Sequence, residues 1–438
     1  MPSTYLTRNF TAGNRRTYTI SCWIKRTGFS SDYQSVHVAG AGDDGIFFES
    51  DNTLHVWFNG GEKRTNKVFR DTNAWYHIVC TVDTTNSTAG DRIKIYINGE
   101  RETSFQTDTN PTLNAENHYN DNGKINRIGN HTSSNYEFNG SMSHIHLIDG
   151  TAYDASVFGE TDANGVWKIK TSPSVTYGTN GYFILKDGNS VTDQSGNTNN
   201  FTVGAGTLTK TEDCPSNVFA TFNPLDGATS LGNSTFTFGN TRWNSESGSN
   251  KCWTRSTLGM TSGKYYFEMK VETPSNNCAI GISDRPAPNL IDELGAGAYD
   301  YSYQSQNGET INNGIAESHG NSYTTNDIVM CALDLDNNKL YFGKNGTWQN
   351  SGDPTSGSTG TGAAYNVTAP SLTNGGAYFF CGADLTGANN TILQANFGNG
   401  YFGTTAVSSA GTNASGIGIF EYDVPTGYTA LSTKGLNL

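Results

Sequence analysis

Paired carboxylates are the first chemistry to consider, because the chain has 40 Asp and Glu among its 438 residues. A glycosidase needs two carboxyl groups about 5–10 Å apart in a cleft. On strands such pairs follow a Glu-x-Asp-x-x-Glu pattern, which this chain lacks. Glu268 and Glu272 share a strand face, but Lys270 lies between them. We therefore expect both glutamates on a solvated outer face, and we predict no catalytic residue.

The histidine and serine patterns also indicate no catalytic site. The sequence has no G-x-S-x-G nucleophile turn and no H-x-x-x-H or HExxH zinc spacing. His144 and His146 are two residues apart, so on a strand they would lie on one side. A half-buried strand face explains them, with a metal pair as the alternative. We predict no metal ligands.

Aromatic residues are the better indication of a binding site. Trp57 and Trp348 lie beside Asn-Gly turns, where an indole can be exposed. Tyr299, Tyr301 and Tyr303, in "GAYDYSYQS", fall on one face of an extended segment. An aromatic row beside Asn and Asp suits sugar stacking or a protein interface. Ordinary packing inside a sandwich is the alternative. These five residues are our candidate binding site.

The elements that would position these residues are short strands at intervals of 8–15 residues, separated by Gly and Asn turns. Two hairpins share one pattern: "DRIKIYINGERE" turns at Asn98-Gly99, and "NNKLYFGKNGTWQN" turns at Asn345-Gly346. Asn-Gly supplies the two positive φ angles of a type I′ turn. The sequence predicts an all-β protein of two antiparallel, jelly-roll-like β-sandwich domains in tandem.

The expected organisation has four parts. Residues 1–205 form the first sandwich, 206–234 a polar connector, 235–405 the second sandwich, and 406–438 an extension that packs on the second. We expect one short helix at 288–296. We also expect a mobile Gly/Ser/Thr loop in "SGDPTSGSTGTGAAY", residues 351–365.

Bulk composition excludes several classes of function. The net charge of −13 offers no basic face for nucleic acid. The N-terminus shows no signal-peptide pattern, and no run of about 18 apolar residues could insert in a membrane. Cys22, Cys80, Cys331 and Cys381 lie inside apolar runs, so we expect buried thiols rather than disulfides.

Two stretches resemble known domain families. Residues 1–205, with "YTISCWIKR", "WYHIVCTVD", "DRIKIYINGE" and "GSMSHIHLIDG" in that order, resemble laminin-G-like, concanavalin A-type jelly rolls. Residues 235–405, with "SGKYYFEMKVE", "AIGIS", "DIVMCALDLDNNKLYFGKNGTWQNSGDP" and "ANFGNGYF", resemble the SPRY domain. The joint between them resembles structural proteins of tailed bacteriophages of marine bacteria and cyanobacteria.

These resemblances imply folds and a setting. Laminin-G-like relatives often hold calcium through loop carboxylates, so calcium at Asp43-Asp44 or in the loop from Asp83 to Asp91 stays open, although the spacing matches no EF-hand pattern. We expect no other cofactor. In SPRY domains, partner-binding loops lie near the tyrosine segment and after "KNGTW".

The resulting hypothesis is a non-enzymatic virion protein for adhesion, receptor binding or decoration, on a tail fibre, a tail tip or the capsid surface. Its expected partners are other virion proteins and a host surface glycan or protein, with a trimer or another symmetric assembly on the particle. It would be made in the host cytoplasm and located in the virion. The alternatives are a purely architectural capsid cement protein and an enzyme that degrades host polysaccharide.

Overall fold

The structure is a computed structural model that describes residues 4–40, 44–132, 136–186, 190–227, 234–245, 251–284, 293–371, 375–387 and 390–438. It is nearly all-β, with 44% strand and 4% helix, which confirms the predicted fold class. The chain divides into two compact units. Unit 1 comprises residues 1–210 and 214–216, and unit 2 comprises residues 211–213 and 217–438. Most of the helix expected at 288–296 lies outside the described residues.

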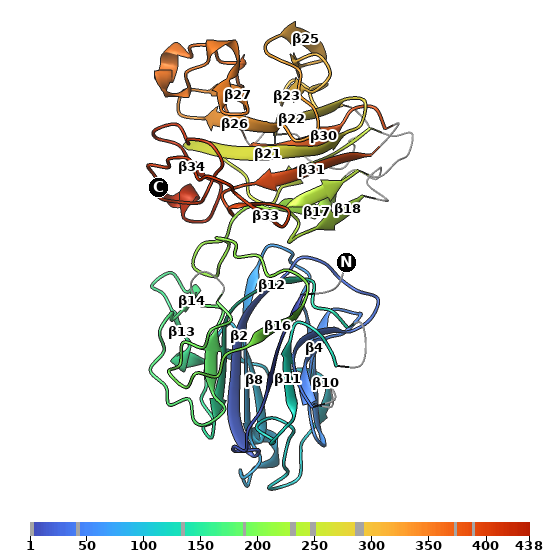
Figure 1. Ribbon diagram of the computed structural model, residues 1–438, viewed down its shortest axis with the longest axis vertical. Coiled ribbons are helices and arrows are strands. Elements are labelled where there is room, and N and C mark those ends of the chain that lie inside the picture. The colour runs from blue at the N-terminus through green and yellow to red at the C-terminus, as the bar shows by residue number, and fades with distance from the viewer. Residues whose placement is uncertain are drawn as a thin grey trace. The chain divides into compact units, whose positions relative to one another are not determined.

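Unit 1 is built from antiparallel sheets (Figure 1), two of which form its sandwich. In the described residues the larger sheet has the order β10 (Phe105–Thr109), β6 (Gly61–Val68), β5 (Thr53–Phe58), β4 (Asp44–Phe48), β3 (Gln34–Ala39), β11 (Ile125–Ile128), β1 (Tyr5–Asn9) and β16 (Thr202–Ala205). The smaller has the order β15 (Tyr182–Ile184), β12 (Gly140–Asp149), β2 (Thr17–Arg26), β7 (Trp75–Asp83), β8 (Ile93–Ile97) and β9 (Glu100–Arg101).

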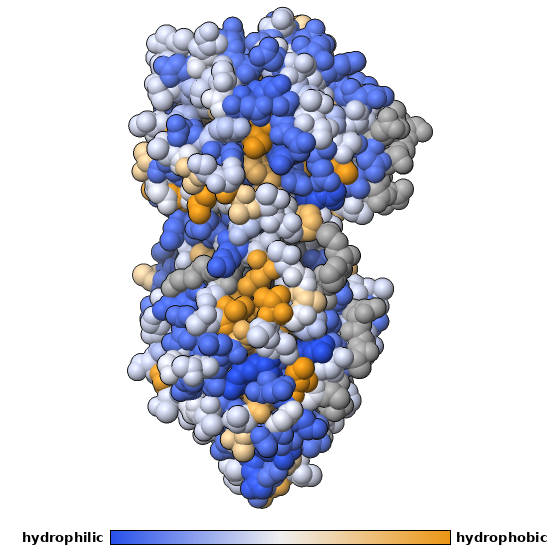
Figure 2. All heavy atoms as spheres, viewed as in Figure 1, coloured by the Kyte–Doolittle hydropathy of each residue, from blue (hydrophilic) through white to orange (hydrophobic). Residues whose placement is uncertain are grey.

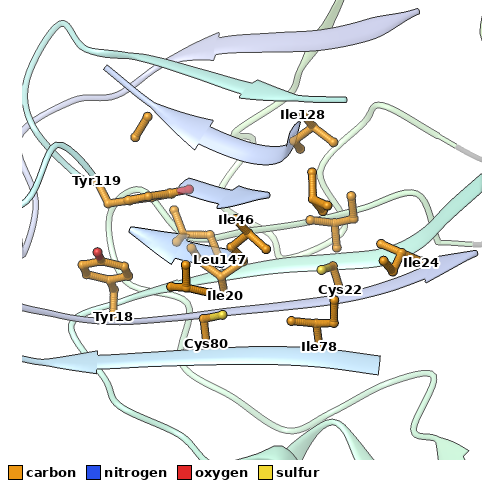
Figure 3. Packing of buried hydrophobic residues seen from close by; sticks show 14 of the residues in the cluster. Tyr18, Ile20, Cys22, Ile24, Ile46, Ile78, Cys80, Tyr119, Ile128 and Leu147 are labelled. Atoms are coloured by element: carbon orange, nitrogen blue, oxygen red, sulfur yellow. The ribbon is translucent and has the colours of Figure 1, made fainter. Parts of the chain in front are cut away.

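Alternation along the strands builds the core of unit 1. Ile20, Cys22 and Ile24 of β2 are fully buried on its inner side. They point toward Ile46 of the opposite sheet (Figure 3). Each buried Ile contributes roughly 1.5–3 kcal/mol. Burial also raises the pKa of the Cys22 thiol to about 12, so this thiol stays protonated and packs as a small apolar side chain. All seven cysteines are free, and Cys22, Cys80, Cys331 and Cys381 are buried as predicted.

A buried polar network crosses this core. His37 on β3 lies between the hydroxyls of Tyr119, 2.6 Å from Nδ1, and Tyr182, 2.5 Å from Nε2. Tyr119 donates to the His37 carbonyl, and the Asn126 amide donates to the Tyr182 hydroxyl. Tyr182 therefore donates to Nε2, while Nδ1–H donates to Tyr119, and every member is bonded with a neutral imidazole. Burial lowers the pKa of His37 to about 3.

A β-bulge changes the expected alternation of β12. The pairing register with β2 shifts between Ser143 and His146, and His144 has a φ of +48°. Ile145 and Leu147 enter the core, and Met142 packs against the same core. The predicted shared side of His144 and His146 is confirmed, because both rings pack on Phe183 at 5.6 and 3.9 Å. Alternation alone would place Met142 on that side as well, and this is wrong because the bulge adds a residue to the strand.

Unit 2 is a second antiparallel sandwich. In the described residues one sheet has the order β17 (Phe222–Gly227), β20 (Cys252–Ser256), β30 (Phe379–Asp384), β22 (Cys278–Ser283), β23 (Asp300–Gln304), β24 (Glu309–Asn312) and β25 (Ile315–Ser318). The other has the order β18 (Thr235–Thr237), β19 (Arg242–Asn244), β31 (Thr391–Asn396), β21 (Lys264–Pro274), β26 (Ile328–Asp334), β27 (Lys339–Lys344) and β28 (Thr347–Trp348). Strands β29 (Tyr365–Asn366) and β34 (Thr429–Ala430) join it at β27 and β21.

Both faces of β21 are covered. Tyr265, Phe267, Met269 and Val271 enter the core between the sheets, as the alternation predicts. On the other face, Tyr266 packs in a second apolar cluster with residues of the C-terminal segment: Phe420, Val424, Tyr428 and Ala430. The Tyr266 and Phe420 rings meet edge to face at 4.9 Å. Residues 406–438 therefore complete unit 2 by covering the outer face of its sheet.

The two Asn-Gly hairpins are local copies of one another. Both turns have positive φ at both central residues: 49° and 85° at Asn98-Gly99, and 48° and 84° at Asn345-Gly346. These angles confirm the predicted type I′ turn. In addition, each Asn side chain accepts a 2.8 Å hydrogen bond from the neighbouring strand, at the amide of His77 for Asn98 and of Ile328 for Asn345.

Two segments expected to be irregular take part in unit 2. Of the expected connector, 206–234, the part from 217 onward belongs to unit 2, and Phe222 is in its core. The expected mobile loop, 351–365, contains the 3₁₀ helix η5 (Pro354–Thr359). The Tyr428 hydroxyl donates to the Pro354 carbonyl at 3.0 Å, which attaches this loop to the C-terminal segment. The loop is therefore packed rather than free.

Candidate functional site

The glutamates considered as an acid–base pair have separate structural roles. Glu268 is fully buried, so the expectation that it lies on a solvated face is wrong. Its carboxylate accepts hydrogen bonds from the amides of Glu421 (2.9 Å) and Tyr422 (2.8 Å), the Tyr266 hydroxyl (2.9 Å) and the Asn396 amide (3.2 Å). Burial raises the pKa of Glu268 to about 7, against the opposing effect of these bonds. The reason for the wrong expectation is the C-terminal segment, which covers this face.

Glu272 forms a surface ion pair. Its two carboxylate oxygens accept hydrogen bonds of 2.7 and 2.8 Å from Arg242, and the Gln394 amide donates another. The hydrogen bonds from Arg242 lower the pKa of Glu272. One glutamate is thus enclosed and the other is paired with a guanidinium, so they form no acid–base pair facing a cleft.

A Ser–His contact in unit 1 has the wrong tautomer for nucleophilic catalysis. His77 Nε2 lies 2.9 Å from Ser21 Oγ, and Trp167 Nε1 lies 3.0 Å from His77 Nδ1. An indole N–H can only donate, so Nδ1 must accept and Nε2 carries the proton. A base that activates serine needs the opposite arrangement. Burial also lowers the pKa of His77 to about 3.

The residues considered for metal binding are bonded within the fold. Asp44 is fully buried and accepts from the amide of Asn59 at 2.7 Å and from that of His118. Asp91 pairs with Arg101 at 2.6 Å, and Asp43 lies outside the described residues. Within the described ranges, no group of three His, Cys, Asp or Glu side chains could hold a metal ion.

Of the predicted aromatic row, two tyrosines belong to the core of unit 2. Tyr301 and Tyr303 lie on β23 and are 3% and 0% exposed. Tyr303 stacks on Phe342 of the opposite sheet at 5.3 Å. The prediction of an exposed row is wrong for both, because the face they share is the inner one. Tyr299, just before the strand, is half-buried.

Trp348 is also partly enclosed. It is half-buried on β28, and its ring meets that of buried Tyr266 at 6.3 Å. It therefore packs at the margin of the cluster under the C-terminal segment. This position supports the fold and exposes only part of the indole.

Trp57 has the exposure expected of a binding residue. It lies on β5 and is 47% exposed. Strand pairing places Glu62 of β6 directly across from it, and the neighbouring pair is His55 with Arg64. Residues two apart on a strand share a face. We call these four residues the Trp57 face.

The polar groups of the Trp57 face are held in place from behind. His55 Nδ1 lies 2.6 Å from the buried carboxylate of Glu49. Arg64 donates from Nη2 to Asp51 at 2.7 Å and from Nε to Thr53 at 3.0 Å. On the outer side His55 Nε2 lies 3.3 Å from Glu62 Oε1, at ion-pair distance, although the contact does not have hydrogen-bond geometry. The face thus combines an exposed indole with fixed polar groups.

Sequence reasoning found Trp57 but missed its companions. Glu62 and Arg64 carry no pattern of their own, and only the register of β5 against β6 brings them beside Trp57 and His55. The signal available was the alternation of "TLHVWF" followed by the Asn59-Gly60 turn. On the face seen in Figure 2, polar residues cover most of both units, and apolar residues gather in one larger patch on unit 1 and in several small groups.

Comparison with domain families agrees with these two sandwiches. The profile of the concanavalin A-like lectin/glucanases superfamily, of laminin-G type, matches residues 3–158. The profile of the SPRY domain matches residues 264–372. The fold and these matches define the class of protein: a laminin-G-like, concanavalin A-like domain followed by a SPRY domain.

Individual relatives match over a small part of their length. The ATP-dependent RNA helicase DDX1 of Xenopus laevis is 32% identical over 92 residues, covering 21% of this chain and 12% of the helicase. Ran-binding protein 9 of Danio rerio is 29% identical over 86 residues, covering 19% and 14%. The match to these curated relatives thus spans about an eighth of their length.

Similar solved structures include a SPRY domain and a pentraxin. The SPRY domain of human HERC1 has 18% identity and a TM-score of 0.31, covering 40% of this chain and 96% of that one. A SAP-like pentraxin from Limulus polyphemus has 17% identity and a TM-score of 0.26, covering 35% and 72%. Likeness at this level carries no conclusion about function. No helix in the described ranges is long and apolar enough to cross a membrane.

Proposed function

We propose that this chain is a non-catalytic binding protein of a bacteriophage particle. The observation that carries the proposal is a contrast between two sets of polar groups. The Trp57 face presents an exposed indole beside the charged side chains of Glu62 and Arg64. Glu268 and His77, which could act as acid or base, use their hydrogen bonds within the fold.

Each unit supports a different contact in this proposal. The SPRY domain of unit 2 supports a protein partner, either another virion protein or a protein of the host surface. The Trp57 face of unit 1 supports a second, separate contact. The virion setting rests on the resemblance of the tandem and its joint to phage structural proteins. A symmetric homo-oligomer on the particle belongs to the same proposal.

Labelling of intact particles tests the setting, and competition tests the binding. Antibodies raised against the full chain should label purified phage particles, and an excess of the purified chain should reduce phage adsorption to host cells. Absence of the chain from purified particles would contradict the virion proposal. Release of new reducing ends from host polysaccharide by the chain would contradict the non-catalytic one.

A further inference from the structure

We propose that Lys63 and Asn110 become joined by an isopeptide bond, an amide between their side chains, with Asp108 as the acid–base group. The bond joins strand β6 to the segment that follows β10, in the larger sheet of unit 1. This covalent modification goes beyond the binding function proposed above and does not depend on it. It commits to two residues that react and one that moves their protons.

Lys63 is enclosed, although charged side chains mostly lie in solvent. Its side chain is 3% exposed. Nζ donates to Asp108 Oδ1 and, at 3.2 Å, to Asn110 Oδ1. It also lies 5.1 Å from the centre of the Phe105 ring. A primary amine, a carboxyl group and a primary amide therefore meet at one enclosed position.

Strand pairing produces this contact. Asp108 lies directly across from Lys63 in the pair of β6 and β10. Asn110 comes two residues later, so it meets Lys63 as a diagonal neighbour, within reach of a long side chain. Gly61 leaves space for this approach, because a Cβ there would lie 2.5 Å from Cδ of Pro111.

The reaction needs no reagent besides these three side chains. Asp108 takes a proton from the Lys63 ammonium, which leaves an amine with a free electron pair. This pair forms a bond to Cγ of Asn110, and the bond between Cγ and Nδ2 breaks. Asp108 relays two protons from Nζ to the departing nitrogen, which leaves as ammonium, and ends as a carboxylate. Nζ keeps one hydrogen in the new amide.

The surroundings of Asn110 favour this reaction over its usual alternative. Contact with Lys63 makes the attack intramolecular, which is equivalent to a very high local concentration of amine. An asparagine ordinarily loses its amide when the backbone nitrogen of the next residue attacks Cγ. Here the next residue is Pro111, whose nitrogen carries no hydrogen, so that route is closed. The Asp108 side chain is 51% exposed, which lets the released ammonium escape to solvent.

The bond closes a loop of chain that passes through both sheets of the sandwich. Between residues 63 and 110 the chain forms β7 and β8 of the smaller sheet and returns to the larger sheet as β10. In the described part of unit 1, β10 is an outer strand of its sheet, and three of its five residues are exposed. A covalent link holds this outer strand in place and restricts the unfolded chain, as a disulfide does. The seven cysteines supply no such link, because all of them are free.

An ion pair without reaction is the competing explanation of the enclosed lysine. It accounts for the contact between Lys63 and Asp108, and it leaves the covalent structure of the chain unchanged. The isopeptide bond removes one ammonia and produces a branched peptide. Mass spectrometry therefore separates the two explanations.

Intact-mass measurement of the full chain under denaturing conditions tests this inference. We expect a mass below that of the sequence by one ammonia, about 17 Da. Digestion should give a branched peptide in which Lys63 is joined to Asn110. Lys63→Arg, Asp108→Ala and Asn110→Ala should each lack the mass loss, because each removes one of the three groups. Lys63→Arg keeps the positive charge, and circular dichroism of each variant checks that it is folded.

Lys339→Arg is the matched control. Lys339 also donates to a side-chain oxygen of an asparagine, Asn366, but this contact is exposed, so the ammonium there stays hydrated. This variant should keep the mass loss. Ring closure at an Asn-Gly pair also releases ammonia, but mild alkali reverses it and leaves an isopeptide bond intact. A mass equal to that of the sequence, a loss that persists in Lys63→Arg, or a loss that mild alkali reverses would each overturn the inference.

Discussion

Acidification should destabilise unit 1, which has buried histidines, and should stabilise unit 2, which has buried carboxyl groups. The perturbation is a change of pH from 7.5 to 5.0. In unit 1, burial lowers the pKa values of His37 and His77 to about 3 from an ordinary 6.5. The folded state then binds fewer protons than the unfolded state between pH 3 and 6.5. The free energy of unfolding of unit 1 therefore keeps its full value above about pH 6.5 and falls as the pH drops below it.

The magnitude follows from the linkage relation. At pH 5.0 each histidine costs about 2 kcal/mol relative to pH 7.5, so the pair costs about 4 kcal/mol. Burial also lowers the pKa of His146, which adds to the loss, whereas burial raises the pKa of Asp44, which opposes it. For a domain of about 200 residues, 4 kcal/mol lowers the Tm by roughly 8–16 °C.

The stability of unit 2 should change in the opposite direction and rise on acidification. Burial raises the pKa values of Glu268 to about 7 and of Asp284 to about 6, so the folded state binds more protons in this range. Glu268 alone stabilises unit 2 by about 2 kcal/mol on going from pH 7.5 to 5.0. The lowered pKa of half-buried His319 offsets part of this gain. The two unfolding transitions should therefore move apart or cross.

Differential scanning calorimetry of the full chain at the two pH values measures this shift. His37→Gln, which cannot take up a proton, should remove about half of the pH dependence of the unit 1 transition. NMR of the His37 and His77 ring protons is the second readout, and neither should titrate between pH 7.5 and 5.0. A unit 1 transition that stays constant or rises on acidification would refute the assignment of these histidines as buried and neutral.

Four further substitutions test the packing of the strands. Asn98→Ala and Asn345→Ala should each cost about 1–2 kcal/mol in urea unfolding of their own units, because alanine is disfavoured in the left-handed conformation and the side-chain hydrogen bond is lost. If neither variant were destabilised, the shared turn would be contradicted. Glu268→Ala should cost about 3 kcal/mol or more and admit proteases into residues 406–424, since the amides of Glu421 and Tyr422 lose their acceptor. An unaltered cleavage pattern would contradict this. Gly281→Ala should cost about 3 kcal/mol in thermal unfolding, because its Cβ would lie 1.9 Å from the Tyr301 carbonyl, and a neutral effect would show that β22 and β23 pair differently.

Local chemistry made the hairpins and the inner faces predictable. An Asn-Gly pair between alternating apolar residues determines its own turn, so both I′ hairpins could be assigned from about ten residues each. Alternation along β21 likewise directs Phe267 and Met269 to one side of the strand, and both lie in the core of unit 2. These features depend on neighbours in the sequence.

Features that depend on contacts between distant segments could not be predicted from the local sequence. Glu268 is buried because residues about 150 positions later cover its side of the sheet, and no local pattern reports this. Tyr301 and Tyr303 share a face, as predicted, but which face is inner depends on the opposing sheet. The bulge at His144 reverses the sides of β12 after a single added residue. Trp57 could be recognised from its turn, whereas Glu62 and Arg64 needed the register.

The central claim is that this protein recognises a ligand without transforming it. Incubation of the full chain with purified polysaccharide of the host surface, followed by a count of reducing ends, tests this most directly. We predict that the number of reducing ends stays constant over time. A steady increase in reducing ends that disappears in Glu268→Gln would contradict the account.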